Sequence, residues 1–170
     1  MTSDIDALDW PVGIANFAET SRVWIYQSDR DLTEKECGEI DQFILEFSEK
    51  WTSHNQNLKA TGKTFFSRFA VIVLDQAASN VASGCSIDKQ VSFIQALSNH
   101  YNNDFMNRDQ FLFYRDQSIV SVSMHSLKAE VENGQIKTND LVFNNLVKTL
   151  GELHEKWLTP MSESWHSRFA

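Results

Sequence analysis

The residue types most able to do chemistry gather around Cys85. The run Ser83-Gly84-Cys85-Ser86 joins a loop of small residues to the start of a predicted helix. Gly84 permits unusual backbone angles, either serine can cap the helix, and the helix dipole favours a negative charge beside the cysteine. The same setting lowers the pKa of a thiol. We therefore predict a reactive Cys85, or an anion-binding turn at Ser83, Gly84 and Ser86. The alternative is a capped helix start with a small buried cysteine.

A nucleophilic or redox-sensing thiol needs a base and a group that orients the base. His54 and His166 are the candidate bases, and Asp75, at the end of a predicted strand, is the candidate orienting group. With Cys85 they form the catalytic set of a thiol-dependent enzyme or redox sensor. The histidines show no HxH or HExxH spacing, and Cys37 and Cys85 form no CxxC pair, so we expect no metal site and no cofactor.

The C-terminal run 165–169 places a large ring, a titratable group and a fixed cation together. Arg168 could bind a carboxylate or phosphate while Trp165 stacks on the ligand. In the alternative, the terminus docks on the body, its rings fill the edge of the core, and Arg168 pairs with an acidic surface. Asn144 and Asn145 follow a short predicted strand and suit a tight turn, with contact to a ligand as the alternative.

The run Thr61-Gly62-Lys63-Thr64 looks like the end of a phosphate-binding P-loop. That motif needs a glycine five residues before Gly62, where this chain has Asn57, and a helix after the lysine. The residues that follow are apolar and β-branched and predict a strand, so no helix N-terminus would face a phosphate. We expect no ATP hydrolysis.

Charge and hydropathy exclude several classes of protein. The 15 basic and 23 acidic residues give a net charge of −8, so the field of the protein repels nucleic-acid phosphates and anionic lipid. The longest apolar run, 69–74, is far shorter than the roughly 20 residues of a membrane-spanning helix. The acidic N-terminus lacks the basic and apolar regions of a secretory signal, and we expect a reduced cytoplasmic protein.

Capping residues and periodic apolar residues predict three helices. Thr33 with Glu36, and Thr149 with Glu152, are capping boxes, and Pro160 ends the last helix. The apolar stripe of the first helix comprises Cys37, Ile40, Ile44, Phe47 and Trp51. The stripe of the second comprises Ile87, Val91, Ile94, Leu97 and Tyr101.

Runs of β-branched and aromatic residues predict the strands. They are a buried strand at 23–28, a central strand over 64–75 bent near 67–68, a hairpin over 111–124 and a short strand at 141–143. We predict an α+β fold in which helices pack on one face of a mixed sheet, with a ferredoxin-like variant as one arrangement and a small satellite lobe at 111–147. An irregular arm, 1–21, precedes a single domain over 22–170.

Four runs of the sequence carry a resemblance to a known family. They are Val23–Ser28, Ala82–Asp88, Leu141–Val147 and Ser164–Phe169. On these runs, from about residue 22 onward, the chain resembles a family of short Bacteroidetes proteins often labelled "ABC transporter ATPase". The chain carries neither an intact Walker A motif nor the LSGGQ-type signature of a transporter ATPase, so the resemblance implies no activity.

Together these features predict a module without ATPase activity that binds a small anionic ligand or an unknown protein partner. The alternative is a thiol-dependent enzyme or redox sensor that uses Cys85. We expect binding to neither nucleic acid nor membrane.

Overall fold

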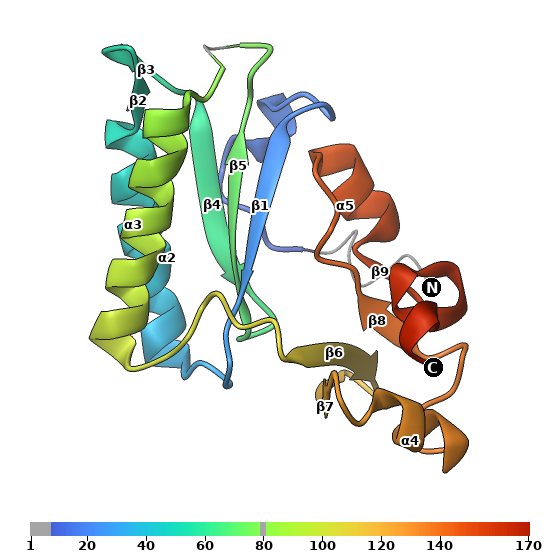
Figure 1. Cartoon of the computed structure of the whole chain (residues 1–170). Helices are drawn as coiled ribbons and strands as arrows, with labels where there is room; N and C mark the ends of the chain where they lie inside the picture. The colour runs from blue at the N-terminus through green and yellow to red at the C-terminus, as the bar shows by residue number, and fades with distance from the viewer. Residues whose placement is uncertain (1–7, 79–80) are drawn as a thin grey trace.

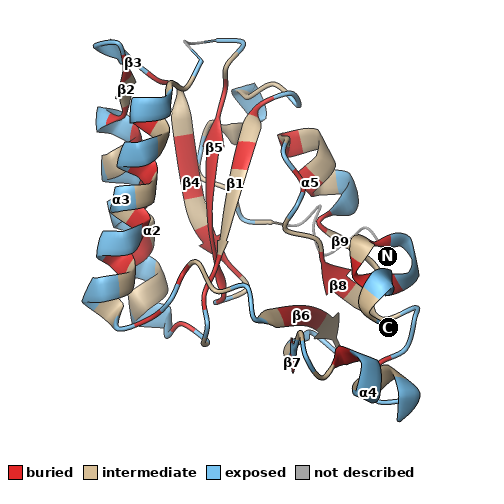
Figure 2. Cartoon of the chain, viewed as in Figure 1, coloured by how far each residue is buried: buried red, intermediate tan, exposed pale blue. Residues whose placement is uncertain are grey.

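A three-stranded antiparallel sheet forms the centre of the molecule (Figure 1). The computed structural model describes residues 8–78 and 81–170. The strand order is β1 (Arg22–Gln27), β5 (Phe69–Leu74) and β4 (Ala60–Phe65). Every residue of β5 is buried, as Figure 2 shows, because the strand lies between two neighbours and both faces of the sheet are covered. The predicted central strand is confirmed for these residues.

The predicted single bent strand over 64–75 is in fact part of a hairpin. Chain reversal occurs at Phe66 and Ser67, whose φ angles are 54° and 52°, and Phe65 pairs with Phe69 across the turn. Positive φ favours glycine or asparagine, and neither stands here, so the sequence carried no turn signal. Arg68, which follows, is buried and binds the carbonyl oxygen of Ser28 and the side chains of Asp31 and Gln110.

Two long helices cover one face of this sheet, α2 (Glu34–Lys50) and α3 (Gly84–Tyr101) (Figure 1). Both capping-box bonds of Thr33 and Glu36 are present. Ile40 and Ile44 are fully buried against β4 and β5, so the first predicted stripe is the core face of α2.

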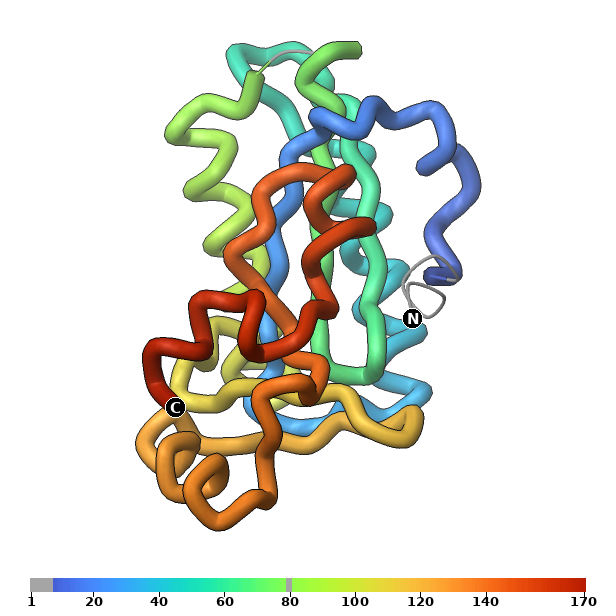
Figure 3. The backbone as a smooth tube through the Cα atoms, turned by 90° about the vertical axis from the view of Figure 1, so that its right-hand side faces the viewer, coloured from blue at the N-terminus to red at the C-terminus, as the bar shows by residue number. Residues whose placement is uncertain are grey.

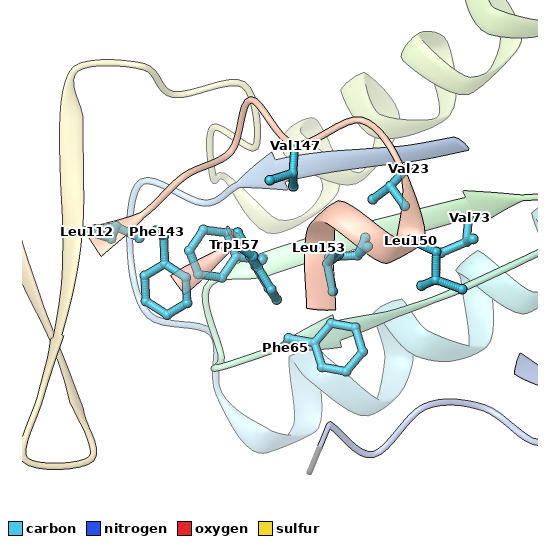
Figure 4. Packing of buried hydrophobic residues seen from close by; sticks show 11 residues of the cluster. Val23, Phe65, Val73, Leu112, Phe143, Val147, Leu150, Leu153 and Trp157 are labelled. Atoms are coloured by element: carbon cyan, nitrogen blue, oxygen red, sulfur yellow. The ribbon is translucent and has the colours of Figure 1, made fainter. Parts of the chain in front are cut away.

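The opposite face of the sheet is covered by α5 (Leu150–Lys156), which Thr149 caps as predicted. Leu150 and Leu153 of this helix, with Trp157 just after it, meet Val23 and Phe65 in one apolar cluster (Figure 4). Helices therefore cover both faces of this sheet, and the prediction that they pack on one face is wrong, because β5 carries apolar side chains on both faces and each face needs a cover.

A second antiparallel sheet follows in the order β7, β6, β8 and β9. Its strands are β6 (Gln110–Arg115), β7 (Ser118–Ser123), β8 (Leu141–Phe143) and β9 (Leu158–Pro160). Its other elements are α4 (Leu127–Glu132) and two 3₁₀ turns, η2 (Met161–Glu163) and η3 (Trp165–Phe169). This lobe begins where predicted and continues beyond residue 147, because β9 adds to β8.

The α+β class is confirmed, whereas the mixed sheet is wrong. All strand pairs among the described residues are antiparallel, including a small hairpin of β2 (Thr52–Ser53) and β3 (Gln56–Asn57). β1 and β4 run in the same direction, but β5 lies between them and pairs with both. The order β1-α2-β4-β5-α3 matches the first five elements of a ferredoxin-like unit. After them the chain leaves for the second sheet, and the outer edge of β1 receives no fourth strand.

The N-terminal arm docks on the sheet. Its first seven residues lie outside the described part of the chain, and residues 8–21 contain one short turn, η1 (Ile14–Asn16). The ring of Trp10 lies edge-on to that of Phe65, with centroids 4.6 Å apart. In the described residues, none of the helices has the length and apolar character that crossing a membrane requires.

Candidate binding cleft

A cleft of about 860 Å³ lies along the outer edge of β1. One wall is formed by α3 and by residues 105–108, and the other by β6, the turn after β8 and the C-terminal η3. Figure 3 shows the end of the chain lying beside the segment that leads into β6. The volume lies within the range of small-molecule sites, and much of the lining is apolar.

A chain of hydrogen bonds ties the base of the cleft together. Trp157 Nε1 donates to Asn145 Oδ1, and Asn145 Nδ2 donates to Gln27 Oε1, each at 2.9 Å. Gln27 Nε2 in turn donates to the backbone oxygen of Gln110, also at 2.9 Å. Asn145 therefore lines the cleft with its amide oxygen and its amide nitrogen both hydrogen-bonded within the chain. Its role is to hold Trp157 and Gln27 in place relative to each other.

Replacing Asn145 by leucine should lower the free energy of unfolding by about 2 kcal/mol. The change removes two hydrogen bonds and leaves Trp157 Nε1 and Gln27 Oε1 without these partners. Chemical denaturation of N145L, Q27L and the double variant N145L/Q27L tests whether the two side chains are energetically coupled. The double variant should lose clearly less free energy of unfolding than the two single variants lose in sum. Strictly additive losses would contradict the coupling.

The charged side chains that line the cleft are all cations: Arg108, Lys148 and Arg168. All three are exposed, and in the described residues none forms an ion pair. The guanidinium of Arg168 lies 5.9 Å from the centre of the Trp165 ring, and its Nε donates to the backbone oxygen of Trp165. The predicted pairing of Arg168 with an acidic surface is therefore absent from the described part of the chain.

His166 is buried where the cleft meets the C-terminal turn. Its ring stacks on Trp165, with centroids 4.0 Å apart, and lies edge-on to Phe111 at 4.7 Å. Nδ1 is hydrogen-bonded to Ser164 Oγ at 2.7 Å. Burial lowers the pKa of His166 to about 4, because the charged imidazolium would lose its hydration. The residue is thus neutral near pH 7.

The structure brings together four of the residues that the sequence singled out. Trp165, His166, Arg168 and Asn145 all line the cleft. Asn144 lies beside them, where its Oδ1 accepts from Trp165 Nε1 at 3.0 Å and from the amide of Leu146 at 3.2 Å. The turn interpretation describes Asn144, which accepts from the nearby amide of Leu146, whereas Asn145 bonds to residues distant in the sequence and lines the cleft; contact of either side chain with a ligand stays a prediction.

The residues around Cys85 lie elsewhere. Ser83 caps α3 by accepting from the amide of Ser86, and Cys85 is exposed on the first turn. Figure 1 places the start of α3 at the top of the molecule and the C-terminus at the lower right, and His166 lines the cleft whereas Cys85 does not. Gly84 and its neighbours do not line the cleft. The catalytic set is therefore not assembled with His166 as its base.

The remaining two catalytic candidates, His54 and Asp75, lie in a turn and at the end of a strand. His54 is exposed in the turn between β2 and β3, with a φ of 50°. Asp75 is buried and accepts from Lys59 Nζ at 3.0 Å and from the amides of Ala77 and Ala78. Burial alone would raise the pKa of Asp75, but these hydrogen bonds lower it below its usual value. Its role is to secure the loop after β5.

The P-loop-like run lies inside β4, whose start at Ala60 extends the predicted strand backward, and a second strand follows it. Lys63 Nζ binds the carboxylate of Asp9 at 2.8 Å, and the amide and hydroxyl of Thr64 both donate to Asp41 Oδ1 at 2.7 Å. These groups are thus occupied by partners within the chain, and no helix follows them.

Sequence reasoning missed Gln27, Gln110, Arg108 and Lys148. Gln27 and Lys148 each follow an apolar residue, Arg108 and Gln110 stand in a short polar run, and no local pattern distinguishes any of them from ordinary surface residues. Only their shared position in the cleft reveals them.

Comparisons with protein-family models, with curated proteins and with solved structures found no match to this chain. The described residues contain no group of three or more His, Cys, Asp or Glu side chains arranged to hold a metal ion.

Proposed function

We propose that this protein is a binding module whose ligand joins an anionic group to an apolar body and lies in the cleft beside β1. The observation that carries the proposal is the charge of the lining: its charged side chains are three cations, in a chain whose acidic residues outnumber its basic ones by 23 to 15. Cations without carboxylate partners attract an anion, and an apolar floor favours a ligand with an apolar part.

The individual side chains support this reading. Arg168 lies over the face of Trp165, which limits its freedom before a ligand arrives. Phe111 and Leu112, both buried, contribute apolar surface to the floor. Binding is favoured over thiol catalysis because His166 lines this cleft whereas Cys85 does not. Placement in the cytoplasm and membership of the Bacteroidetes family are part of the proposal and rest on the sequence.

Thermal-shift and calorimetric titrations with octyl phosphate and octanoate test the proposal. Both anions should stabilise the protein, whereas octanol and octylammonium should do so much less. The variant R108Q/K148Q/R168Q should bind octyl phosphate at least tenfold more weakly. A matched variant that removes three exposed cations elsewhere, K50Q/K128Q/K137Q, should bind it as the wild type does. Equal stabilisation by all four compounds, or none by any, would overturn the proposal.

A further inference from the structure

The outer edge of β1 carries unpaired backbone groups that face the cleft. β1 is the last strand of its sheet, and the amide of Ser28, just after it, donates toward β5, to Arg68. The amide of Val23 donates in the opposite direction, to the carbonyl oxygen of Lys148 at 2.9 Å. Because backbone groups alternate in direction along an antiparallel strand, those of Ile25 and the amide of Gln27 also point outward. Within residues 8–78 and 81–170, no backbone group pairs with Ile25 on this side.

The chain itself already uses the start of this edge as a strand partner. Arg22 and Thr149 form an antiparallel bridge, and the amide of Leu150 donates to the carbonyl oxygen of Ser21 at 2.9 Å. The backbone pairing then stops: among the described residues, the turn at 144–147 reaches β1 through the side chain of Asn145, which donates to Gln27, and through no backbone hydrogen bond. The cleft opens beside the part of β1 that this turn leaves uncovered.

We infer that an extended, acidic segment of a partner protein fills the cleft by pairing with β1 as a fourth strand. The inference rests on the proposed function and names the ligand as a peptide. At about 3.3 Å per residue, the open edge beside 24–27 takes roughly four residues of peptide. Backbone hydrogen bonds would supply the pairing, the apolar lining would receive alternate side chains, and the three cations would meet carboxylates.

Charge decides against a second copy of this chain as the occupant. A two-fold pairing of β1 with β1 would bring Arg108, Lys148 and Arg168 of one copy toward the same residues of the other. Both copies would also carry a net charge of −8. An acidic peptide instead places unlike charges together, and a single strand is narrow enough to lie between the walls of the cleft.

The test uses the full chain and a capped heptapeptide that alternates valine and glutamate, Val-Glu-Val-Glu-Val-Glu-Val, with calorimetry as the readout. Two further versions carry N-methyl groups on either the valines or the glutamates. In a strand only one of these sets has amides facing β1, so one version should bind at least tenfold more weakly than the other. A version with lysine in place of glutamate should not bind detectably.

Variants of Ile25 address the same hydrogen bonds from the side of the protein. I25P removes the outward amide and should abolish peptide binding, while I25V keeps the amide and a β-branched apolar side chain and should bind the peptide at least tenfold more tightly than I25P does. If I25P does not fold, the N-methylated peptides still decide the question with the wild-type chain.

The outcomes separate the inference from the proposed function. Binding of octyl phosphate without binding of the peptide, or peptide binding that both N-methylated versions retain, would overturn the added strand and leave the proposed function standing. If neither the peptide nor the alkyl anions bind, the inference and the proposed function are both overturned. Sedimentation that shows a dimer, lost in I25P, would assign the edge to a second copy and overturn the peptide.

Discussion

Replacing Gly62 by alanine should destabilise the protein by about 3 kcal/mol, or prevent its folding. A Cβ at this position would lie 2.3 Å from the carbonyl oxygen of Val71 and 2.8 Å from Cγ2 of Ile44. Both contacts are far shorter than real Cβ atoms allow, and the first is with the backbone of β5, which cannot move without breaking its pairing on both sides. The glycine is required because the backbone of β5 and the Ile44 side chain of α2 both lie against its Cα.

Gly38 provides a matched control for this change. It lies in α2, it is exposed, and a Cβ there would have no heavy atom within 4 Å. G38A should therefore stabilise the protein by about 0.5–1 kcal/mol, the usual gain of alanine over glycine in a helix. Urea denaturation of the two variants should give effects of opposite sign. A G62A protein as stable as the wild type would contradict the packing described for α2 and β4.

Protein stability should fall by about 3 kcal/mol between pH 6.5 and pH 4 through His166 alone, since its pKa drops from 6.5 to about 4 on folding and each unit corresponds to about 1.4 kcal/mol. In this window the unfolded chain binds the proton and the folded chain does not. The stability conferred by the neutral ring is therefore complete above about pH 6.5, falls as the pH drops, and changes no further below about pH 4.

Two variants isolate this contribution in denaturation curves measured at a series of pH values. H166F keeps an aromatic ring against Trp165 and Phe111 but cannot be protonated, so the slope of stability between pH 4 and 6.5 should flatten. S164A removes the hydrogen bond to Nδ1 but leaves the histidine buried, so it should lower stability evenly and keep the slope. An H166F protein with the wild-type slope would show that His166 is protonated as easily folded as unfolded.

A bound ligand should also report on His166. Because the ring lies at the cleft and stacks on Trp165, a ligand that covers this region excludes water from the imidazole. Because such a ligand favours the neutral ring, protonation of His166 should oppose its binding, and stabilisation by octyl phosphate should shrink as the pH falls toward 4.

The sequence by itself determined the elements whose signals are local. The capping box at Thr33, the side-chain cap at Thr149 and the stripe through Ile40 and Ile44 depend on neighbours three or four residues away, and a helix satisfies them wherever it packs. The apolar run of β5 likewise predicts burial on both faces without reference to the rest of the chain. These signals were sufficient for the α+β class.

Only the tertiary structure decided which residues share a site. Gln27 and Asn145 are 118 positions apart and meet in one hydrogen bond, and Arg108 and Lys148, which look ordinary in the sequence, line one cleft with Arg168. The strand turn at Phe66 was hidden for a related reason, since the partly buried ring packs against Phe143 and Trp157 and so holds a backbone angle that the residue alone disfavours. Long-range packing sets both features, and a short window of sequence holds no record of it.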